Sequence, residues 1–401
     1  MEWKEVDICQ LCDSVSETYK GNASEVVLIN TSDVLDGKCL NHEYVPNKKL
    51  KGQFKKTFRK GDILYSEIRP ANKRFCFVDF EPKDYIASTK LMVLRAHEDV
   101  DPQYLYQILR SNDTLAQLQM LAESRSGTFP QITYSELSNI MVSLPSQKAQ
   151  KNIVSILSSL DRKIELNNKI NADLEEMAQA IFKNWFVDFE PFKDGEFVDS
   201  ELGMIPQGWR VGSLGDMGAV VCGKTPSKTY SNYYGGDIPF IKIPDMHGNV
   251  FVENSEDRLT EEGSLSQIKK LIPPYSLMVS CIATVGLVSI NTKPSHTNQQ
   301  INTVIPHNKC ALFYLYQHIK NNEEFLKNMG RGGTTTLNVN TKSFSNIRLL
   351  IPSEIALEQF HGIVEGLFKK IELNMHESRT LSLLRDTLLP RLMSGEIEVP
   401  E

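Results

Sequence analysis

The five-residue stretch Lys163-Ile164-Glu165-Leu166-Asn167 occurs twice in this chain, returning 207 residues later as Lys370-Ile371-Glu372-Leu373-Asn374. A second match keeps nearly the same offset, because Tyr104-Leu105-Tyr106-Gln107 returns as Tyr314-Leu315-Tyr316-Gln317. The order of such matches is the same in both halves, and loops of different length explain the small drift. A repeat of half the chain predicts two similar domains related by pseudo-symmetry, not a solenoid of short units.

Each copy of this stretch lies inside a long segment with helical patterning. Residues 146–187 contain no glycine or proline, and apolar residues fall at spacings of four and three. This is the heptad pattern of paired helices, and about 40 residues make a rod of roughly 60 Å. The expected seam runs through Ile153, Leu157, Leu160, Ile164, Asn167, Asn171, Leu174, Ala178, Ile181 and Trp185, and through the residues 207 positions later.

The two helices are expected to pair antiparallel, as pseudo-two-fold symmetry requires. Asn167 and Asn374 lie near the helix midpoints and are therefore predicted to lie close together, with Ile164 and Ile371 as neighbouring seam positions. A buried Asn pair lowers stability but penalises slipped registers. The alternative is that each helix lies only on its own domain.

The rest of each half has short β-rich segments separated by turn formers, followed by a shorter helical segment. In the first half the β-rich segments are 26–29, 62–65, 75–78 and 90–94, with a helix around 102–121; in the second they are 238–243, 277–282 and 287–290, with a helix near 311–329. The predicted fold class is α+β: two pseudo-symmetric mixed α/β domains separated by two long helices that form an antiparallel coiled coil. The predicted boundaries are 1–145 for the first domain, 146–187 for the first long helix, 188–352 for a linker plus the second domain, 353–393 for the second long helix, and 394–401 for a tail.

Composition limits the possible functions. The formal net charge is −6, so nucleic-acid binding would require local positive charge. Seven cysteines and no basic-then-apolar leader favour reduced thiols in a cytoplasmic protein without a membrane partner. Cys9 and Cys12 have no second pair at zinc-ligand spacing, so no metal site is predicted.

Local positive charge gathers in residues 48–60, where seven Lys or Arg residues occur within thirteen positions, interleaved with Phe54 and Phe58. Such a strip suits contacts to DNA phosphates, although a solvated charged loop would have the same composition. The candidate phosphate contacts in the first half are Lys55, Lys56, Arg59 and Arg69.

Three further segments carry side chains suited to base edges. Loops 125–131 and 331–338 lie at equivalent places in the repeat, and 296–300 is a third polar cluster. Glycine permits close approach of the backbone to a duplex, Arg can pair with guanine, and Gln or Asn with adenine. Simple turns before strands would also explain the glycine loops. The candidates are Arg125, Ser126, Gly127, Thr128, Gln131, Asn298, Gln299, Arg331, Gly333, Thr334, Thr335 and Asn338.

Two motifs imitate catalytic sites. Residues 218–225 satisfy the P-loop pattern, but Pro226 disfavours the helix that must start there, so Lys224 and Thr225 are better candidates for DNA contacts. Residues 272–275 echo the Pro-Pro-aromatic motif of amino-methyltransferases, but Ile272 cannot accept hydrogen bonds from a target amine. No nuclease cluster is evident, so no catalytic residue is predicted.

With these features, the chain resembles the specificity subunits of type I restriction-modification systems over essentially its whole length. The segments that carry the resemblance are 177–189, 202–209, 223–227 and 389–395. The resemblance implies two target-recognition domains, each reading half of a bipartite, asymmetric site on double-stranded DNA. It also implies helices that set the unread spacer and dock two methyltransferase subunits, which restriction subunits join. Cofactors are expected only on those partners: S-adenosylmethionine, and ATP with magnesium. The competing hypotheses are a P-loop NTPase and a coiled-coil scaffold with no role in DNA binding.

Overall fold

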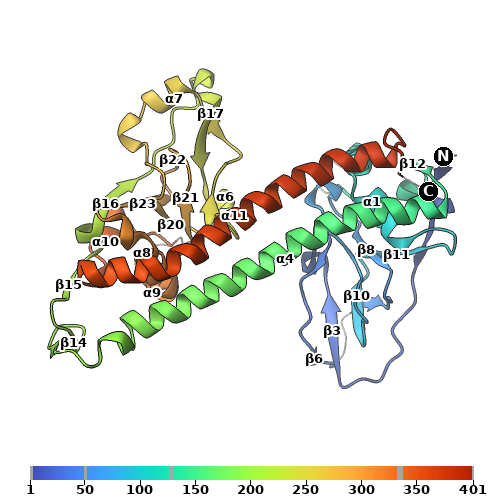
Figure 1. Cartoon of the computed structure of the whole chain (residues 1–401). Coiled ribbons are helices and arrows are strands. Elements are labelled where there is room, and N and C mark those ends of the chain that lie inside the picture. Colours follow the sequence, from blue (N-terminus) through green and yellow to red (C-terminus); the bar gives the residue numbers. More distant parts are fainter. Residues whose placement is uncertain (1–2, 49–51, 126–129, 332–336, 400–401) are drawn as a thin grey trace. The chain divides into compact units, whose positions relative to one another are not determined.

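The computed structural model describes residues 3–48, 52–125, 130–331 and 337–399. The chain forms two compact units: unit 1 comprises Met1–Ile164 and Thr380–Glu401, and unit 2 comprises Glu165–Arg379. Two 40-residue helices, α4 (Gln147–Phe186) and α11 (Glu354–Met393), each contribute to both units. They are the long green and red helices of Figure 1. The sequence pattern predicted them at 146–187 and 353–393.

Unit 1 contains a mostly antiparallel β-structure covered by helices. Two four-stranded sheets have the orders β2-β11-β8-β9 and β6-β3-β10-β7; β3 and β10 are parallel in the second, which is here called the small sheet of unit 1. The strands are β1 (Lys4–Asp7), which pairs with β12 (Met141–Leu144), β2 (Cys12–Val15), β3 (Glu25–Ile29), β4 (Val34–Leu35), β5 (Lys38–Cys39), β6 (Val45–Pro46), β7 (Phe54–Lys56), β8 (Ile63–Ser66), β9 (Phe75–Phe77), β10 (Tyr85–Ser88) and β11 (Leu91–Ala96). The helices are α1 (Pro102–Arg110), α2 (Asn112–Arg125) and α3 (Tyr134–Ser138).

Unit 2 repeats this arrangement. Its larger sheet has the order β16-β23-β20-β21-β18, and its smaller sheet, β19-β17-β22, again contains a parallel pair, β17 with β22. The strands are β13 (Phe197–Val198) and β14 (Ile205–Pro206) in the linker, β15 (Arg210–Ser213), which pairs with β24 (Arg348–Ile351), β16 (Gly218–Cys222), β17 (Tyr234–Ile241), β18 (Phe251–Val252), β19 (Arg258–Leu259), β20 (Leu277–Ser280), β21 (Val288–Asn291), β22 (His296–Thr297) and β23 (Ile301–Pro306). The helices are α5 (Leu214–Met217), α6 (Ile243–Met246), α7 (Glu261–Leu265), α8 (Leu312–Asn321), α9 (Glu323–Gly330) and α10 (Thr341–Ser345).

The matching strand orders confirm the predicted α+β fold of two pseudo-symmetric domains. Helices occupy the segments predicted near 102–121 and 311–329, but each segment is split into two helices, so the prediction of a single helix near 311–329 is wrong in detail. Ser111 adopts an extended conformation and its hydroxyl accepts the Thr114 N–H (3.2 Å), so it starts α2. Asn322 ends α8 by donating its side-chain amide to His318 O (2.7 Å). The apolar periodicity continues across both breaks, which is why it did not reveal them.

Within each unit the two long helices run antiparallel. In unit 2, Asn167 lies against Asn374 while Phe182, further along α4, contacts Phe360, earlier in α11. In unit 1, Asp161 bonds Arg385, and Ile153, earlier in α4, shares a core with Leu392. Antiparallel pairing places residues with rising numbers on α4 against falling numbers on α11.

The predicted seam is incomplete at the end of α4, where Ile181 and Trp185 pack against the core as predicted and Trp185 contacts Phe360 of α11. Phe182 and Phe186 are buried there, whereas the predicted Ile181 and Trp185 are only partly buried. An α-helix drifts by about 20° per heptad relative to a strict 3.5-residue repeat, so the buried face moves around the helix. Phe186 also packs against Trp209 of the recognition domain, so this end of α4 serves two contacts.

The middle of the seam is polar. Asn167 and Asn374 are 0% and 1% exposed. Asn167 Nδ2 lies within hydrogen-bonding distance of Asn374 O (3.4 Å), Glu377 Oε2 (2.8 Å) and Ser378 Oγ (3.2 Å), and Asn374 Nδ2 donates to Asn171 Oδ1 (2.9 Å). The structure thus brings the two amides together, as the pattern predicts.

The other predicted pairing positions differ in burial. Ile371 is fully buried in unit 2, while Ile164, the last residue of the first segment of unit 1, is partly buried. Unit 1 has its own polar step, where Asp161 accepts from Arg110 Nη1 (3.0 Å) and Arg385 Nη1 (2.7 Å). Among the described residues, no helix has both the length and the apolar character needed to cross a membrane.

Candidate nucleic-acid interface

Two of the predicted segments of unit 2, separated by more than 70 residues in sequence, meet at the end of its small sheet. The backbone N–H of Gly223 donates to Ile301 O (3.0 Å), and that of Lys224 donates to Thr297 O (2.9 Å). A Cβ on Gly223 would lie 2.1 Å from Asn298 O, so only glycine permits this approach. The structure therefore places Lys224 and Thr225 beside Asn298 and Gln299.

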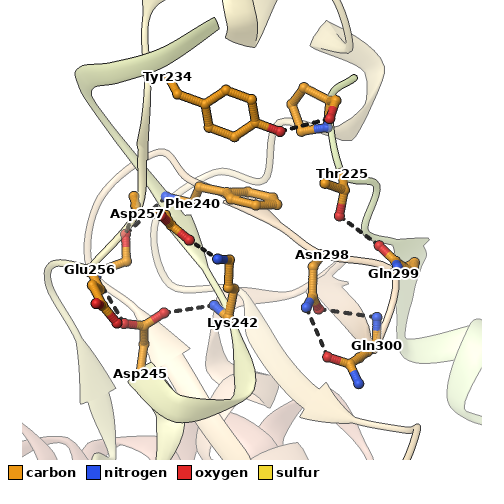
Figure 2. A network of polar contacts seen from close by, with 12 residues as sticks. Thr225, Tyr234, Phe240, Lys242, Asp245, Glu256, Asp257, Asn298, Gln299 and Gln300 are labelled. Carbon is orange, nitrogen blue, oxygen red and sulfur yellow. Dashed lines mark hydrogen bonds and ion pairs between the residues drawn. The ribbon is translucent and has the colours of Figure 1, made fainter. Parts of the chain in front are cut away.

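Side chains reinforce this contact. Thr225 Oγ1 donates to Gln299 Oε1 (2.7 Å), and the Tyr234 hydroxyl donates to Pro226 O (2.7 Å), as Figure 2 shows. Lys224 and Gln299 are exposed. The loop at 223–226 is thus fixed at both ends while its polar side chains remain accessible to a ligand.

The neighbouring amides play a different part. Asn298 is 8% exposed; its Nδ2 donates to Gln300 Oε1 (3.0 Å), and its Oδ1 accepts from Gln300 N (3.1 Å). This closed pair supports the turn that follows β22 (Figure 2). Of the three consecutive amide side chains, Gln299 is the exposed one.

The first residue of the same polar cluster, His296, is fully buried. Its Nε2 lies 2.8 Å from Ser264 Oγ, and burial lowers the pKa of the imidazole to about 4. His296 is therefore a neutral part of the core beneath the loops. No periodic pattern in residues 296–300 separates this buried residue from the exposed Gln299.

Lys242, which sequence reasoning missed, lies near the same loops. Its ammonium group pairs with Asp257 and lies 5.8 Å from the centre of the Phe240 ring. Asp245 accepts from the backbone N–H groups of Lys242 (2.8 Å) and Glu256 (3.0 Å), which fixes the turn (Figure 2). The available signal is a lysine that directly follows an apolar strand and precedes an aspartate by three residues, but an acidic residue at this spacing commonly caps a short helix.

The positive strip of unit 1 also lies on a small sheet. Lys55 and Arg59 are exposed, and Lys55 lies in β7. Lys56 is partly buried; its Nζ donates to Leu91 O (2.8 Å), and burial lowers its pKa. Lys56 therefore supports the sheet, while Lys55 and Arg59 can meet phosphates. Lys49 and Lys51 lie outside the described residues.

Arg69 lies in a separate turn of unit 1. Its backbone is left-handed (φ 46°), its side chain is exposed, and its N–H donates to Pro130 O (3.1 Å). The turn thus lies next to the second arm of the 125–131 loop.

The two small sheets present different elements at equivalent places. In unit 2 the residues after β22 carry the exposed Gln299. In unit 1 the corresponding end of β10 is covered by β7, where Ser88 pairs with Phe54 and Thr89 N donates to Gln53 O (2.7 Å). The same scaffold therefore displays the basic strip in one unit and an amide-bearing loop in the other.

The two glycine-containing loops are only partly described. Ser126, Gly127, Thr128, Gly333, Thr334, Thr335 and the side chain of Arg125 lie outside the described residues. Both loops rejoin the fold in the same way, since Gln131 bridges to Ile68 and Asn338 bridges to Ile282. Asn338 is exposed and Gln131 partly buried. Arg331 is exposed, and its Nη1 donates to Asn328 Oδ1 (2.7 Å).

The structure does not support nucleotide binding at residues 218–225, which satisfy the P-loop pattern. No helix starts at Lys224, because β16 is followed by irregular chain in which Thr225 turns toward Gln299. A P-loop needs that helix to bind phosphates. In the described part of the chain, no three His, Cys, Asp or Glu side chains are grouped as metal ligands.

Comparisons with known proteins agree with this arrangement. A family model described as the type I restriction modification DNA specificity domain matches residues 2–176 and again residues 206–381, once in each copy of the repeat. The type I restriction enzyme HindI specificity subunit of Haemophilus influenzae is 41% identical, and the alignment covers 99% of this chain and 100% of that protein. The type I restriction enzyme MjaIX specificity subunit of Methanocaldococcus jannaschii is 29% identical, over 90% and 85%. The crystal structure of a type I restriction-modification S subunit from M. genitalium has a similar fold, with a TM-score of 0.56 at 14% identity over 100% of this chain and 97% of that one.

Proposed function

Because this chain belongs to the family of type I restriction-modification DNA specificity subunits, we propose that its two recognition domains each read one half of a bipartite DNA site. The chain is a DNA-recognition subunit and not an enzyme. The observation that carries the proposal is the duplicated topology, in which equivalent small sheets display different polar elements. Two similar scaffolds with different displayed side chains suit two different half-sites separated by bases that are not read.

In this proposal Lys and Arg side chains bind the phosphates of the double-stranded DNA, and neutral polar side chains contact the base edges. Lys55 and Arg59 in unit 1, and Lys224 in unit 2, are exposed and can neutralise phosphates in a chain whose net charge is −6. Phosphate contacts position a protein on DNA, whereas contacts to base edges give sequence specificity. Binding is therefore expected to weaken as salt rises.

The chemistry is assigned to partners. Two methyltransferase subunits would supply S-adenosylmethionine, restriction subunits would supply ATP and magnesium, and this chain would hold no cofactor itself. The two paired helices would fix the length of the unread gap.

Exposed apolar residues on the long helices support docking of two copies of one partner. Three pairs, each separated by the repeat offset of 207, remain exposed on α4 and α11. They are Ile156 (36%) with Ile363 (48%), Leu166 (51%) with Leu373 (57%), and Met177 (51%) with Leu384 (45%). Single exposed apolar residues are common, but the same set in both copies of a repeat favours a duplicated protein interface.

Methylation mapping tests the proposed function. The chain is co-expressed with its modification subunit, and modified bases are located by sequencing. We expect one new motif made of two short, different half-sites around a fixed gap. A soluble complex that methylates nothing, or that methylates one continuous site, would contradict the proposal.

A charge placed on each proposed docking position tests the partner assignment. Leu166→Glu and Leu373→Glu are each expected to reduce the bound methyltransferase from two copies to one, and the double variant to none, as measured by native mass spectrometry. Leu202→Glu changes an equally exposed leucine (54%) in the linker and should keep both copies. Two copies retained on the double variant would show that the partner docks elsewhere.

A further inference from the structure

Gln299 stands out among the candidate residues because it combines exposure with a fixed side chain. We propose that Gln299 is a specificity-determining residue of the second recognition domain, and that it pairs with an adenine in the major groove. Thr225 acts as its positioning residue. This inference rests on the proposed function, since it names the contact by which that domain reads its half-site.

The position of Gln299 is rigid for an exposed residue. It lies two residues after the end of β22. The preceding residue, Asn298, is in contact with Gly223, and the Asn298–Gln300 pair closes the turn around Gln299. Its side chain is held by Thr225, whose loop is in turn fastened by the bond from Tyr234 to Pro226 O. Figure 2 shows these supports around Gln299. A fixed polar side chain loses little conformational entropy when it binds.

The hydrogen bond from Thr225 also defines which atoms of Gln299 remain available. The Thr225 hydroxyl donates to Gln299 Oε1 (2.7 Å), which uses one of the two lone pairs on that oxygen. Among the described residues no other group bonds this amide, so the second lone pair and both Nε2 hydrogens remain for a ligand. The available groups are thus one acceptor and one donor side by side.

This pair of groups matches one base in the major groove. Adenine presents the N6 amino group as a donor and N7 as an acceptor, and Gln pairs with both at once. Guanine presents two acceptors, O6 and N7, which would leave the second lone pair of Oε1 facing another acceptor. The geometry therefore favours an A·T pair at the position that Gln299 contacts.

The neighbouring residues are suited to supporting parts. Asn298 is only 8% exposed and both ends of its amide bond Gln300, so burial keeps it from a base, whereas Gln299 is exposed. Lys224 and Lys228 are exposed on the adjoining loop and form no ion pair within the described parts of the chain, so they can meet phosphates. The loop thus divides into phosphate contacts and one base contact.

The test substitutes these residues in the full chain, co-expressed with its modification subunit, and maps methylated bases. The motif methylated with Gln299→Ala should have the same gap and the same other half-site, but any base pair should be accepted at one position that is A·T for the unsubstituted chain. Competition between duplexes that differ at this pair should show a loss of discrimination of about 5- to 150-fold. Thr225→Val should weaken the same position, and Thr225→Ser, which keeps the hydroxyl, should restore it. Gln207→Ala, an exposed glutamine in the linker, is the matched control and should leave the motif unchanged.

The outcomes separate this inference from the proposed function. If the unsubstituted chain directs methylation to a bipartite motif and Gln299→Ala directs it to the same motif with the same discrimination, the inference is overturned while the function stands. Relaxation at a G·C pair would overturn the adenine assignment. If the unsubstituted chain directs no methylation, the proposed function itself fails.

Discussion

Replacing Asn374 by leucine is expected to destabilise unit 2 by about 2–3 kcal/mol. Asn374 is 1% exposed, and its Nδ2 donates to Oδ1 of Asn171, which is 9% exposed. Loss of a neutral hydrogen bond lowers stability by about 1 kcal/mol, and a buried acceptor left without its donor adds about 1–3 kcal/mol. Since Asn171 is at the edge of burial, the lower part of that range applies.

The double variant is more informative than either single one. When Asn171 and Asn374 are both leucine, no acceptor is stranded and two apolar residues face the seam, so stability should approach that of the original chain. The coupling energy between the two positions should be about 1–2 kcal/mol in favour of the double variant.

The assay is urea unfolding followed by tryptophan fluorescence. Trp185 and Trp209 belong to unit 2 and Trp3 to unit 1, so a Trp3→Phe background reports on unit 2 alone. The control is Asn168→Leu, at an exposed position of α4 three residues before Asn171, which should change the stability of unit 2 by less than about 0.5 kcal/mol. Additive effects of Asn171→Leu and Asn374→Leu would refute the argument, because residues that share a buried hydrogen bond must couple.

Three further results are expected. Asp161→Asn should lower the stability of unit 1 by about 2–4 kcal/mol, because Arg110 and Arg385 have side chains only 10% and 17% exposed. Asp99→Asn is the exposed control in the same unit, and equal urea midpoints for the two variants would contradict this. Burial lowers the pKa of His296 and His318 to about 4, so between pH 6.5 and 4 the unfolded chain binds protons that the folded chain does not. As pH falls through this range, unit 2 should therefore lose up to about 1.4 kcal/mol of stability per pH unit for each histidine. Identical urea midpoints at pH 7, 6 and 5 would disprove this. Gly223→Ala should destabilise unit 2 by about 1–3 kcal/mol, because the new Cβ would collide with Asn298 O. Gly362→Ala has open space around it in α11 and should stabilise unit 2 by up to about 1 kcal/mol. The reverse order of melting temperatures would refute both assignments.

The sequence predicted correctly those features that appear in it as repeated patterns. The 207-residue offset indicated two similar domains, and heptad spacing indicated long helices with Asn167 and Asn374 at the seam. The heptad spacing did not identify Phe182 and Phe186 as buried. These two residues also pack onto the recognition domain, against Tyr314 and Trp209, which changes the buried face of α4 there.

The candidate site could be predicted only in parts. The sequence singled out 223–227 and 296–300 separately, but nothing local indicates that Thr225 bonds Gln299, since that contact depends on how β16 and β23 pair. Nor does composition separate the exposed Gln299 from the buried His296 three residues earlier. Covering of β10 by β7 is likewise a long-range pairing, visible only once the small sheet of unit 1 is assembled.

In the proposed function each domain independently reads one half of the DNA site. The most direct test replaces residues 1–145 by the matching domain of the Haemophilus influenzae relative and maps methylated bases with the same modification subunit. We expect a hybrid motif in which one half-site changes while the other half-site stays the same. A hybrid that changes both half-sites, or neither, while remaining active would contradict independent recognition by two domains.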